Sequence, residues 1–215
     1  MTAEPVSTTY PARLAVDYVE QHNRLTSFFR LFMVIPIGIV FAVLTAGNTK
    51  TVYDKSGAMV SSTSNDIMAS LFLATLLMIL FRQRYPRWWF DFWVELTRFG
   101  ARIGAYLALL NDEYPSTVEE QTVHLEIDYP DAERDLNRWL PLVKWLLAIP
   151  HFIIVGLLFI AAFFAVVIAW FAILFTGRYP RGLFDFVVGV FRWALRVEAY
   201  AILLVTDRYP PFSLA

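Results

Sequence analysis

Long uncharged runs of apolar residues dominate the chain. Residues 31–49 contain no charged side chain, and residues 67–81 form a second such run. A third run, residues 145–177, is interrupted only by the ionisable ring of His151. Because a helix rises about 1.5 Å per residue, about 20 apolar residues cross the hydrocarbon of a bilayer. The pattern therefore predicts membrane-spanning helices.

The third run is too long for one span. As a single helix, residues 145–177 would be about 50 Å long, which exceeds what tilting accommodates. We therefore expect two spans joined by a tight turn near residues 160–162, although neither Gly nor Pro marks that turn. The four expected spans are residues 27–47, 65–82, 140–159 and 162–176.

The second half of the chain repeats the first. Residues 81–92 match residues 175–186 at an offset of 94, with Arg-Tyr-Pro-Arg in both. Upstream, the match runs at an offset of 114, so the first copy carries an insertion of about 20 residues, the polar stretch 48–66. We therefore expect two tandem membrane modules, residues 1–115 and 116–215.

Each module ends in an apolar segment that carries one stripe of charges. The stripe follows a helical spacing and consists of Asp91, Glu95, Arg98 and Arg102 in the first copy and Asp185, Arg192 and Arg196 in the second. A charge at the bilayer centre costs about 2.5–3.5 kcal/mol, so a crossing helix is disfavoured. We expect amphipathic interfacial helices at residues 88–110 and 182–205. Six spans, with both helices crossing, is the alternative.

A short strand precedes the spans of each module. Val123, Leu125 and Ile127 alternate with His124 and Glu126, which is the pattern of a half-buried strand. Residues 13–18 form a weaker equivalent. The expected fold is therefore an all-α integral membrane protein, a tandem duplicated module with about four transmembrane helices, two amphipathic interfacial helices and short cytoplasmic β-strands.

Charge is divided unevenly along the chain. Residues 111–138 carry a net charge of −7, so the remainder carries +6 of the formal total of −1. The arginines beside the expected spans are Arg13, Arg24, Arg30, Arg82, Arg84, Arg87, Arg178 and Arg181. With four spans, all of them lie on one side. Because cytoplasmic loops are enriched in Arg and Lys, we expect a multi-pass protein of the bacterial inner membrane with both termini in the cytoplasm.

Three segments resemble a known family. Residues 125–130, 139–151 and 175–186 are similar to a bacterial membrane-protein family catalogued as domain of unknown function 4389. The resemblance is looser in the first copy, where Gln83 stands at the position of Gly177. It implies a membrane location and this helical layout in two tandem copies. The family carries no known activity, so it implies no functional residues.

The repeated Arg-Tyr-Pro-Arg motif is the first candidate site. Its residues are Arg84, Tyr85 and Arg87 in one copy and Arg178, Tyr179 and Arg181 in the other. They could bind lipid phosphates or the acidic surface of a partner. The alternative is a turn that ends one helix and begins the next, with arginine side chains that extend to the interface.

Three residues inside the apolar runs are the second candidate site. His151 could be a proton relay or a ligand contact, or a neutral ring near the interface. Pro36 and Pro150 occupy equivalent positions in the two copies. They could break two helices around a substrate site, as in transporters built from repeats, or simply kink helices that pack well.

No motif indicates catalysis. The chain lacks Cys, and no spacing suggests a metal site, a nucleotide-binding loop or an activated nucleophile. We expect no enzyme activity, no cofactor and no nucleic-acid partner. The composition favours a non-enzymatic membrane scaffold or accessory subunit that contacts membrane lipids and a protein partner or itself. The alternative is a small transporter, channel or lipid-handling protein. An enzyme acting on lipid would need Asp91, Asp185 and His151 to converge.

Overall fold

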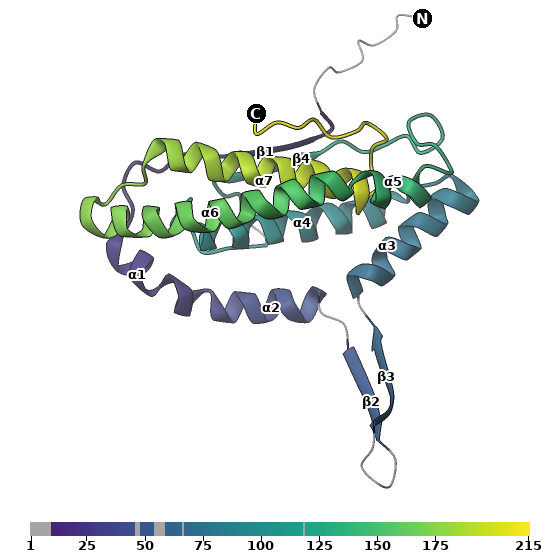
Figure 1. Ribbon diagram of the computed structural model, residues 1–215, viewed down its shortest axis with the longest axis horizontal. Helices are drawn as coiled ribbons and strands as arrows, with labels where there is room; N and C mark the ends of the chain where they lie inside the picture. Colours follow the sequence, from purple (N-terminus) through teal and green to yellow (C-terminus); the bar gives the residue numbers. More distant parts are fainter. Residues whose placement is uncertain (1–9, 46–47, 54–58, 66, 118) are drawn as a thin grey trace, which may run out of the picture.

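Helices make up most of the fold, and two strand pairs accompany them (Figure 1). This computed structural model describes residues 10–45, 48–53, 59–65, 67–117 and 119–215. The elements of the first half are β1 (Ala12–Val16), α1 (Arg24–Met33), α2 (Ile35–Thr45), β2 (Asn48–Tyr53), β3 (Met59–Asn65), α3 (Ile67–Leu77), the π-helical turn η1 (Met78–Arg82) and α4 (Arg87–Leu107). Those of the second half are β4 (Val123–Ile127), α5 (Pro141–Leu147), α6 (Ile149–Thr176) and α7 (Arg181–Ala201).

The strand of each half packs on the last helix of the other half. β1 and β4 pair in antiparallel fashion, with Leu14 opposite Leu125. β1 contacts α7, and β4 contacts α4. Leu14 and Leu125 are buried, while Arg13 is half-buried and Glu126 is exposed, as the alternation predicts. The two halves are therefore joined by a reciprocal exchange of strands.

The expectation of an all-α protein with about four transmembrane helices is wrong. The fold is mixed, with a two-stranded sheet, β1–β4, that holds the two halves together. Within the described residues, only the segments Arg24–Thr45 and Ile149–Thr176 are long and apolar enough to cross a membrane. The helical segment Ile67–Arg82 is too short.

The expected hairpin at residues 160–162 does not exist. The expected spans 140–159 and 162–176 lie largely within one continuous helix, α6, of 28 residues. Because α6 contains no Pro after Pro150 in its first turn and only one Gly, Gly156, the following backbone amides can continue the helical hydrogen bonding. The helix ends at Gly177, which adopts a left-handed conformation with φ 74°.

The helices with charged stripes are not interfacial. Twelve residues of α7 are buried, among them Arg196, and Arg102 is buried on α4. Arg192 Nε donates to the carbonyl of Leu14 at 3.0 Å, and Arg98 Nη2 donates to that of Leu125 at 3.2 Å. Arg98 and Arg192 of the stripe therefore face the exchanged strands, whereas Asp91, Glu95 and Asp185 are exposed. A pattern read from one helix alone cannot reveal a strand that is far away in sequence.

Strands β2 and β3 occupy most of the insertion. They pair in antiparallel fashion, from Asn48 opposite Asn65 to Tyr53 opposite Met59. In Figure 1 this hairpin points away from the helices, on the side opposite β1, β4 and the C-terminus. In the second half α6 simply continues, which accounts for the 20-residue difference between the two offsets of the repeat.

Candidate functional site

The two Arg-Tyr-Pro-Arg motifs form corners that bind the exchanged strands. The hydroxyl of Tyr18, just after β1, donates to the carbonyl of Tyr179 at 2.6 Å. The hydroxyl of Tyr129, just after β4, likewise donates to the carbonyl of Tyr85. The guanidinium of Arg181 lies 4.2 Å from the ring centroid of Tyr18. Such a cation–π contact adds to the anchoring of the strand.

The same corner contact recurs in the other half. The guanidinium of Arg87 lies 4.7 Å from the ring centroid of Tyr129. Gln83 stands where the second half has Gly177, and both adopt a left-handed conformation with φ 46° and 74°. A residue other than glycine has a steric cost in this region, so the surrounding structure must impose this conformation on Gln83.

The arginines of the corners are exposed, whereas their tyrosines are not. Arg84 and Arg178 are exposed, and Tyr85 and Tyr179 are buried. Arg87 and Arg181 form ion pairs of 3.6 and 3.8 Å with Asp91 and Asp185. The arginines are therefore accessible to a phosphate or an acidic partner, while the tyrosines act in packing.

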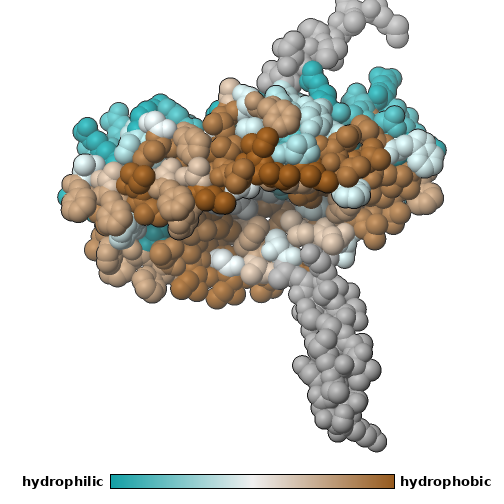
Figure 2. All heavy atoms as spheres, viewed as in Figure 1, coloured by the Kyte–Doolittle hydropathy of each residue, from teal (hydrophilic) through white to brown (hydrophobic). Residues whose placement is uncertain are grey.

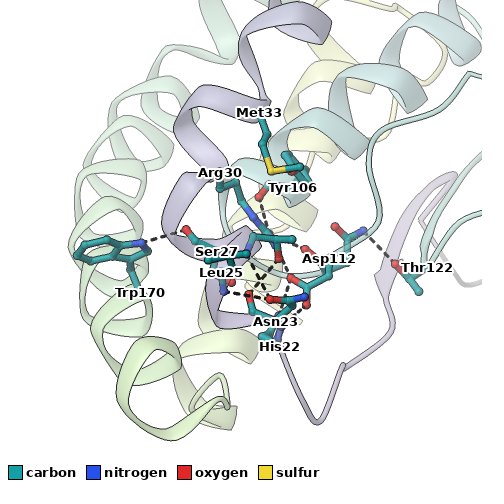
Figure 3. Close-up of polar contacts among 12 residues, drawn as sticks. His22, Asn23, Leu25, Ser27, Arg30, Met33, Tyr106, Asp112, Thr122 and Trp170 are labelled. Carbon is teal, nitrogen blue, oxygen red and sulfur yellow. Dashed lines mark hydrogen bonds and ion pairs between the residues drawn. The ribbon is translucent and has the colours of Figure 1, made fainter.

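A buried ion pair fastens α1 to the end of α4 (Figure 3). Arg30 donates to the carbonyls of Tyr106 and Asn111 at 3.0 and 2.6 Å and to the carboxylate of Asp112. Its guanidinium also lies over the Tyr106 ring at 4.4 Å. Asp112 in turn accepts from the backbone N–H of Asn23 at 2.8 Å. His22 Nδ1 lies 3.3 Å from the same carboxylate.

A second junction has the same design. Lys144 Nζ donates to the carbonyl of Thr206 at 2.8 Å and pairs with Asp207 at 2.7 Å. The Lys144 ammonium lies 5.2 Å from the ring centroid of Tyr200. Asp207 accepts from the backbone N–H of Asn137 at 2.5 Å. The helix α5 is thereby fastened to the end of α7 as α1 is to α4.

Two leucines in left-handed conformations shape these junctions. Leu109 has φ 62° and Leu204 has φ 58°. A bulky residue in this region is strained by about 1–2 kcal/mol, so the surrounding structure must impose it. Each leucine turns the chain after its helix so that the carbonyl two residues later, of Asn111 or Thr206, meets the buried cation.

The electrostatics of the junctions are those of structural ion pairs. Burial alone would raise the pKa of the Asp112 carboxyl, but hydrogen bonds from His22 and from the Asn23 N–H and the charge of Arg30 outweigh it, so this pKa lies below its ordinary value. Burial lowers the pKa of Lys144, and Asp207 opposes that effect. The lowered pKa keeps Asp112 ionised opposite Arg30.

His151 lies in an aromatic box. Its ring is fully buried, stacks on Phe212 with centroids 4.0 Å apart, and lies 4.8 Å from the Tyr209 ring. The indole N–H of Trp193 donates to His151 Nδ1 at 3.0 Å. That nitrogen therefore carries no proton, and the ring contacts aromatic side chains rather than an acid. These contacts anchor the C-terminal tail, residues 207–215, to the first turn of α6.

Asp91, Asp185 and His151 each contact other residues. Asp91 pairs with Arg87 and Asp185 pairs with Arg181, each within its own half of the chain, and neither pairs with His151. In the described part of the chain, no group of three or more His, Asp or Glu residues could hold a metal ion.

The prolines lie at helix starts. Pro36 is the second residue of α2, and Pro150 is the second residue of α6. A proline in the first turn removes no intrahelical hydrogen bond that the helix needs. The breaks after α1 and α5, at Val34 and Ala148, let Arg30 and Lys144 face the junctions while the following helices turn outward.

An extensive apolar face covers α1, α2 and α6 (Figure 2). No residue of α2 is buried, and most side chains of α6 are exposed. The exposed apolar side chains include Phe32, Ile39, Val43, Leu157, Phe163 and Phe175. We call these helices' exposed surface the apolar face. On the opposite side, β1, β4 and the residues that directly follow them carry charged and polar side chains, which we call the polar face: Arg13, Asp17, His124, Glu126 and Asp128.

A cavity of about 550 Å³ opens between α4, α7 and α6. Its walls are apolar except for Thr97 and Glu198, whose side chains are hydrogen bonded at 3.3 Å. Burial raises the pKa of Glu198 to about 6, although the hydrogen bond from Thr97 lowers it. Sequence reasoning missed this site. The available signal was that Glu198 lies off the charged stripe, at the position that matches Gly104.

Residues 139–213 match the family described as domain of unknown function DUF4389. The matched segment contains α5, α6 and α7 together with Lys144, Asp207 and the second Arg-Tyr-Pro-Arg corner. This agrees with the resemblance noted in the sequence, but it covers one copy rather than the two tandem copies expected. No curated protein and no solved structure matches the chain.

Replacing Asp112 by Asn should lower the free energy of unfolding by about 3 kcal/mol, because Arg30 would remain buried without its counter-charge. The matched control is Asp91→Asn, which breaks the exposed pair with Arg87 and should cost about 0–1 kcal/mol. Thermal unfolding in detergent micelles measures both. Equal losses in the two variants would contradict the structural role of the buried pair.

Stability should also depend on pH through Glu198. The ordinary pKa of 4.5 applies to the unfolded chain, and the folded value is about 6, so the folded state binds the proton more tightly between these values. The free energy of unfolding should therefore fall by up to about 2 kcal/mol as pH rises through this window. Glu198→Gln should lose this contribution, which melting curves at several pH values can resolve. Identical pH dependence in both proteins would refute a buried carboxyl.

Proposed function

We propose that the protein is a non-enzymatic membrane scaffold or accessory subunit that is held in one leaflet by its apolar face. The observation that carries this proposal is the exposure of α1, α2 and α6. Leu157, Phe163 and Val43 are 62%, 64% and 71% exposed. Large contiguous apolar surfaces of this kind mark membrane or protein contact sites.

The strands argue for helices that lie along the membrane. β1 follows α7 for most of its length, since Tyr18 contacts Arg181 and the Tyr10 hydroxyl donates to the carbonyl of Arg196 at 3.3 Å. α7 in turn packs against α6. The polar face therefore runs beside α6 rather than beyond its ends.

An upright α6 would place that polar face in hydrocarbon. Arg13 pairs with Glu126 and Asp128 at 3.3 and 2.7 Å, and these side chains are substantially exposed. Several exposed charges at this depth would each cost about 2.5–3.5 kcal/mol. Helices that lie in the interface, with the polar face in water, avoid this cost. The length and hydropathy of α6 then serve to widen the contact with lipid.

The matched contacts support two tandem copies of one module. Arg30 and Lys144, Tyr106 and Tyr200, and the two corners each occur in equivalent positions of the halves. We infer that the copies are related by an approximate two-fold axis through the Leu14–Leu125 pair, perpendicular to the membrane surface. Such an axis gives both copies the same depth in the leaflet, as a single apolar face requires.

We further propose that the polar face lies on the cytoplasmic side of a bacterial inner membrane. The exposed Arg84 and Arg178 support this orientation, because Arg and Lys are enriched on that side. The exposed Glu119, Glu120 and Glu133 then form an acidic surface that is open to a basic protein partner. The buried charges hold the fold together, which supports a role in binding rather than catalysis.

A lipid-handling protein is the second candidate function. The cavity beside Glu198 favours it, because this space combines apolar walls with one polar pair. Both candidate functions require the apolar face to lie in one leaflet, an arrangement that we call the membrane seat.

Replacing Val43 and Leu157 together by Lys should release the protein from membranes, because two charges would enter the apolar face. Flotation with vesicles of neutral lipid measures the effect, and we expect the bound fraction to fall about tenfold. Gln21→Lys is the control, since Gln21 is an exposed residue outside the apolar face. Equal flotation of both variants would refute the membrane seat.

Native mass spectrometry of the protein extracted gently from its own membrane separates the two functions. A stoichiometric second protein, lost on reversing Glu119 and Glu120 to Lys, is expected for the accessory subunit. A chain that carries only a defined lipid would overturn the scaffold proposal in favour of lipid handling.

A further inference from the structure

The cavity beside Glu198 opens on the apolar face. Phe41 of α2 and Phe159 and Phe163 of α6 line it on that side, while Leu14 and Leu125 of the exchanged strands line its inner end. Figure 2 shows the surface hollowed between α6 and α2. Its volume of about 550 Å³ lies within the range of pockets that bind small molecules, about 300–1,000 Å³.

Missing side chains on α4 create this space. Gly100 and Gly104 line the cavity, and a Cβ atom at Gly104 would lie 3.6 Å from the Phe191 ring. A small side chain would therefore fit, but a large one would fill the cavity. At the equivalent position of the second half stands Glu198, whose side chain points toward Thr97 of α4. The two halves thus differ at this position, with Gly104 in one and Glu198 in the other. This difference leaves a cavity with the Glu198 carboxyl group in its wall.

The carboxyl group has room for one more hydrogen bond. Its Oε1 accepts from Thr97 Oγ1 at 3.3 Å. Among the described residues that line the cavity, there is no Lys, Arg or His. An ionised carboxylate is only an acceptor, so a complementary ligand must supply a donor. A hydroxyl group does so without adding a charge to an apolar cavity.

We propose that this cavity binds a lipid alcohol, a single hydrocarbon chain with an uncharged hydroxyl head group that donates to Glu198. The chain lies against Phe159 and Phe163 and leaves through the mouth between α2 and α6. This assignment rests on the proposed membrane seat, because the apolar face then opens the mouth to the leaflet from which the ligand comes. An uncharged head group enters from hydrocarbon at a lower cost than a cation.

The test uses hexadecanol carrying a photoreactive diazirine, added to the protein in nanodiscs of zwitterionic lipid. After irradiation, peptide mapping locates the label. We expect label on the cavity side of α6 and on Phe41, and competition by unlabelled hexadecanol. Glu198→Leu should reduce this label about tenfold, because a hydrogen bond to a charged group is lost. Glu198→Gln should retain most of it, because the amide oxygen still accepts.

Two glycines provide the matched controls. Gly104→Leu narrows the cavity beside Glu198 and should strongly reduce the cavity label. Gly156→Leu adds the same side chain to α6 at a position where a Cβ meets nothing within 4 Å, so the label should persist. If Gly104→Leu fails to fold, as judged by circular dichroism, the Glu198 variants still test whether the alcohol binds in the cavity.

The possible failures are distinguishable. The label could be confined to lipid-facing residues such as Phe175 and be unchanged by Glu198→Leu. That result would overturn the cavity site but would leave the membrane seat supported. Stronger cavity label with the matching diazirine alkylamine would overturn the uncharged head group. Loss of flotation by the wild type would instead overturn the membrane seat, and labelling repeated in detergent solution would then test the cavity by itself.

Discussion

Arg98 and Arg192 bind the backbone of a strand that belongs to the other half of the chain, and the remaining architecture depends on this contact. The guanidinium groups donate to the carbonyls of Leu125 and Leu14, so that these arginines of the two amphipathic helices pack against the exchanged strands. The strands in turn cover these helices on the side that would otherwise meet water. Without the exchange, α4 and α7 would each expose two arginines on an otherwise buried surface.

This arrangement divides the molecule into two unlike sides. Charges are collected on and beneath the strands, while α1, α2 and α6 keep almost none. Arg30 and Lys144 are the cations at the border, and each is neutralised by an aspartate and by carbonyl groups. The fold thus places the charged side chains away from the side formed by α1, α2 and α6. A surface that lies in a leaflet must be free of charge in this way.

Much of this could be foreseen from the sequence, and the failures have physical causes. The alternation at residues 123–127 predicted a strand, and the offset of 114 between the matching segments makes Lys144 the equivalent of Arg30. The number of spans was wrong because a uniform apolar run carries no information on whether the helix turns or continues. The role of the stripe was wrong because its partners in the strands, Leu125 and Leu14, lie 27 and 178 residues away from Arg98 and Arg192 along the chain. The cavity beside Glu198 was missed, because its walls come from elements that lie far apart in the sequence.

The exchange of strands also sets an order of events during synthesis. β1 leaves the ribosome first, whereas α7, the helix that it covers, is made last. At about 5–20 residues per second, roughly 10–30 s separate the two. β1 has no strand partner until β4 is made, and α1 and α2 present apolar side chains well before α7 is made. A chain with this topology gains from early capture by the membrane, since the lipid can hold the first half in place until the second half arrives to close it.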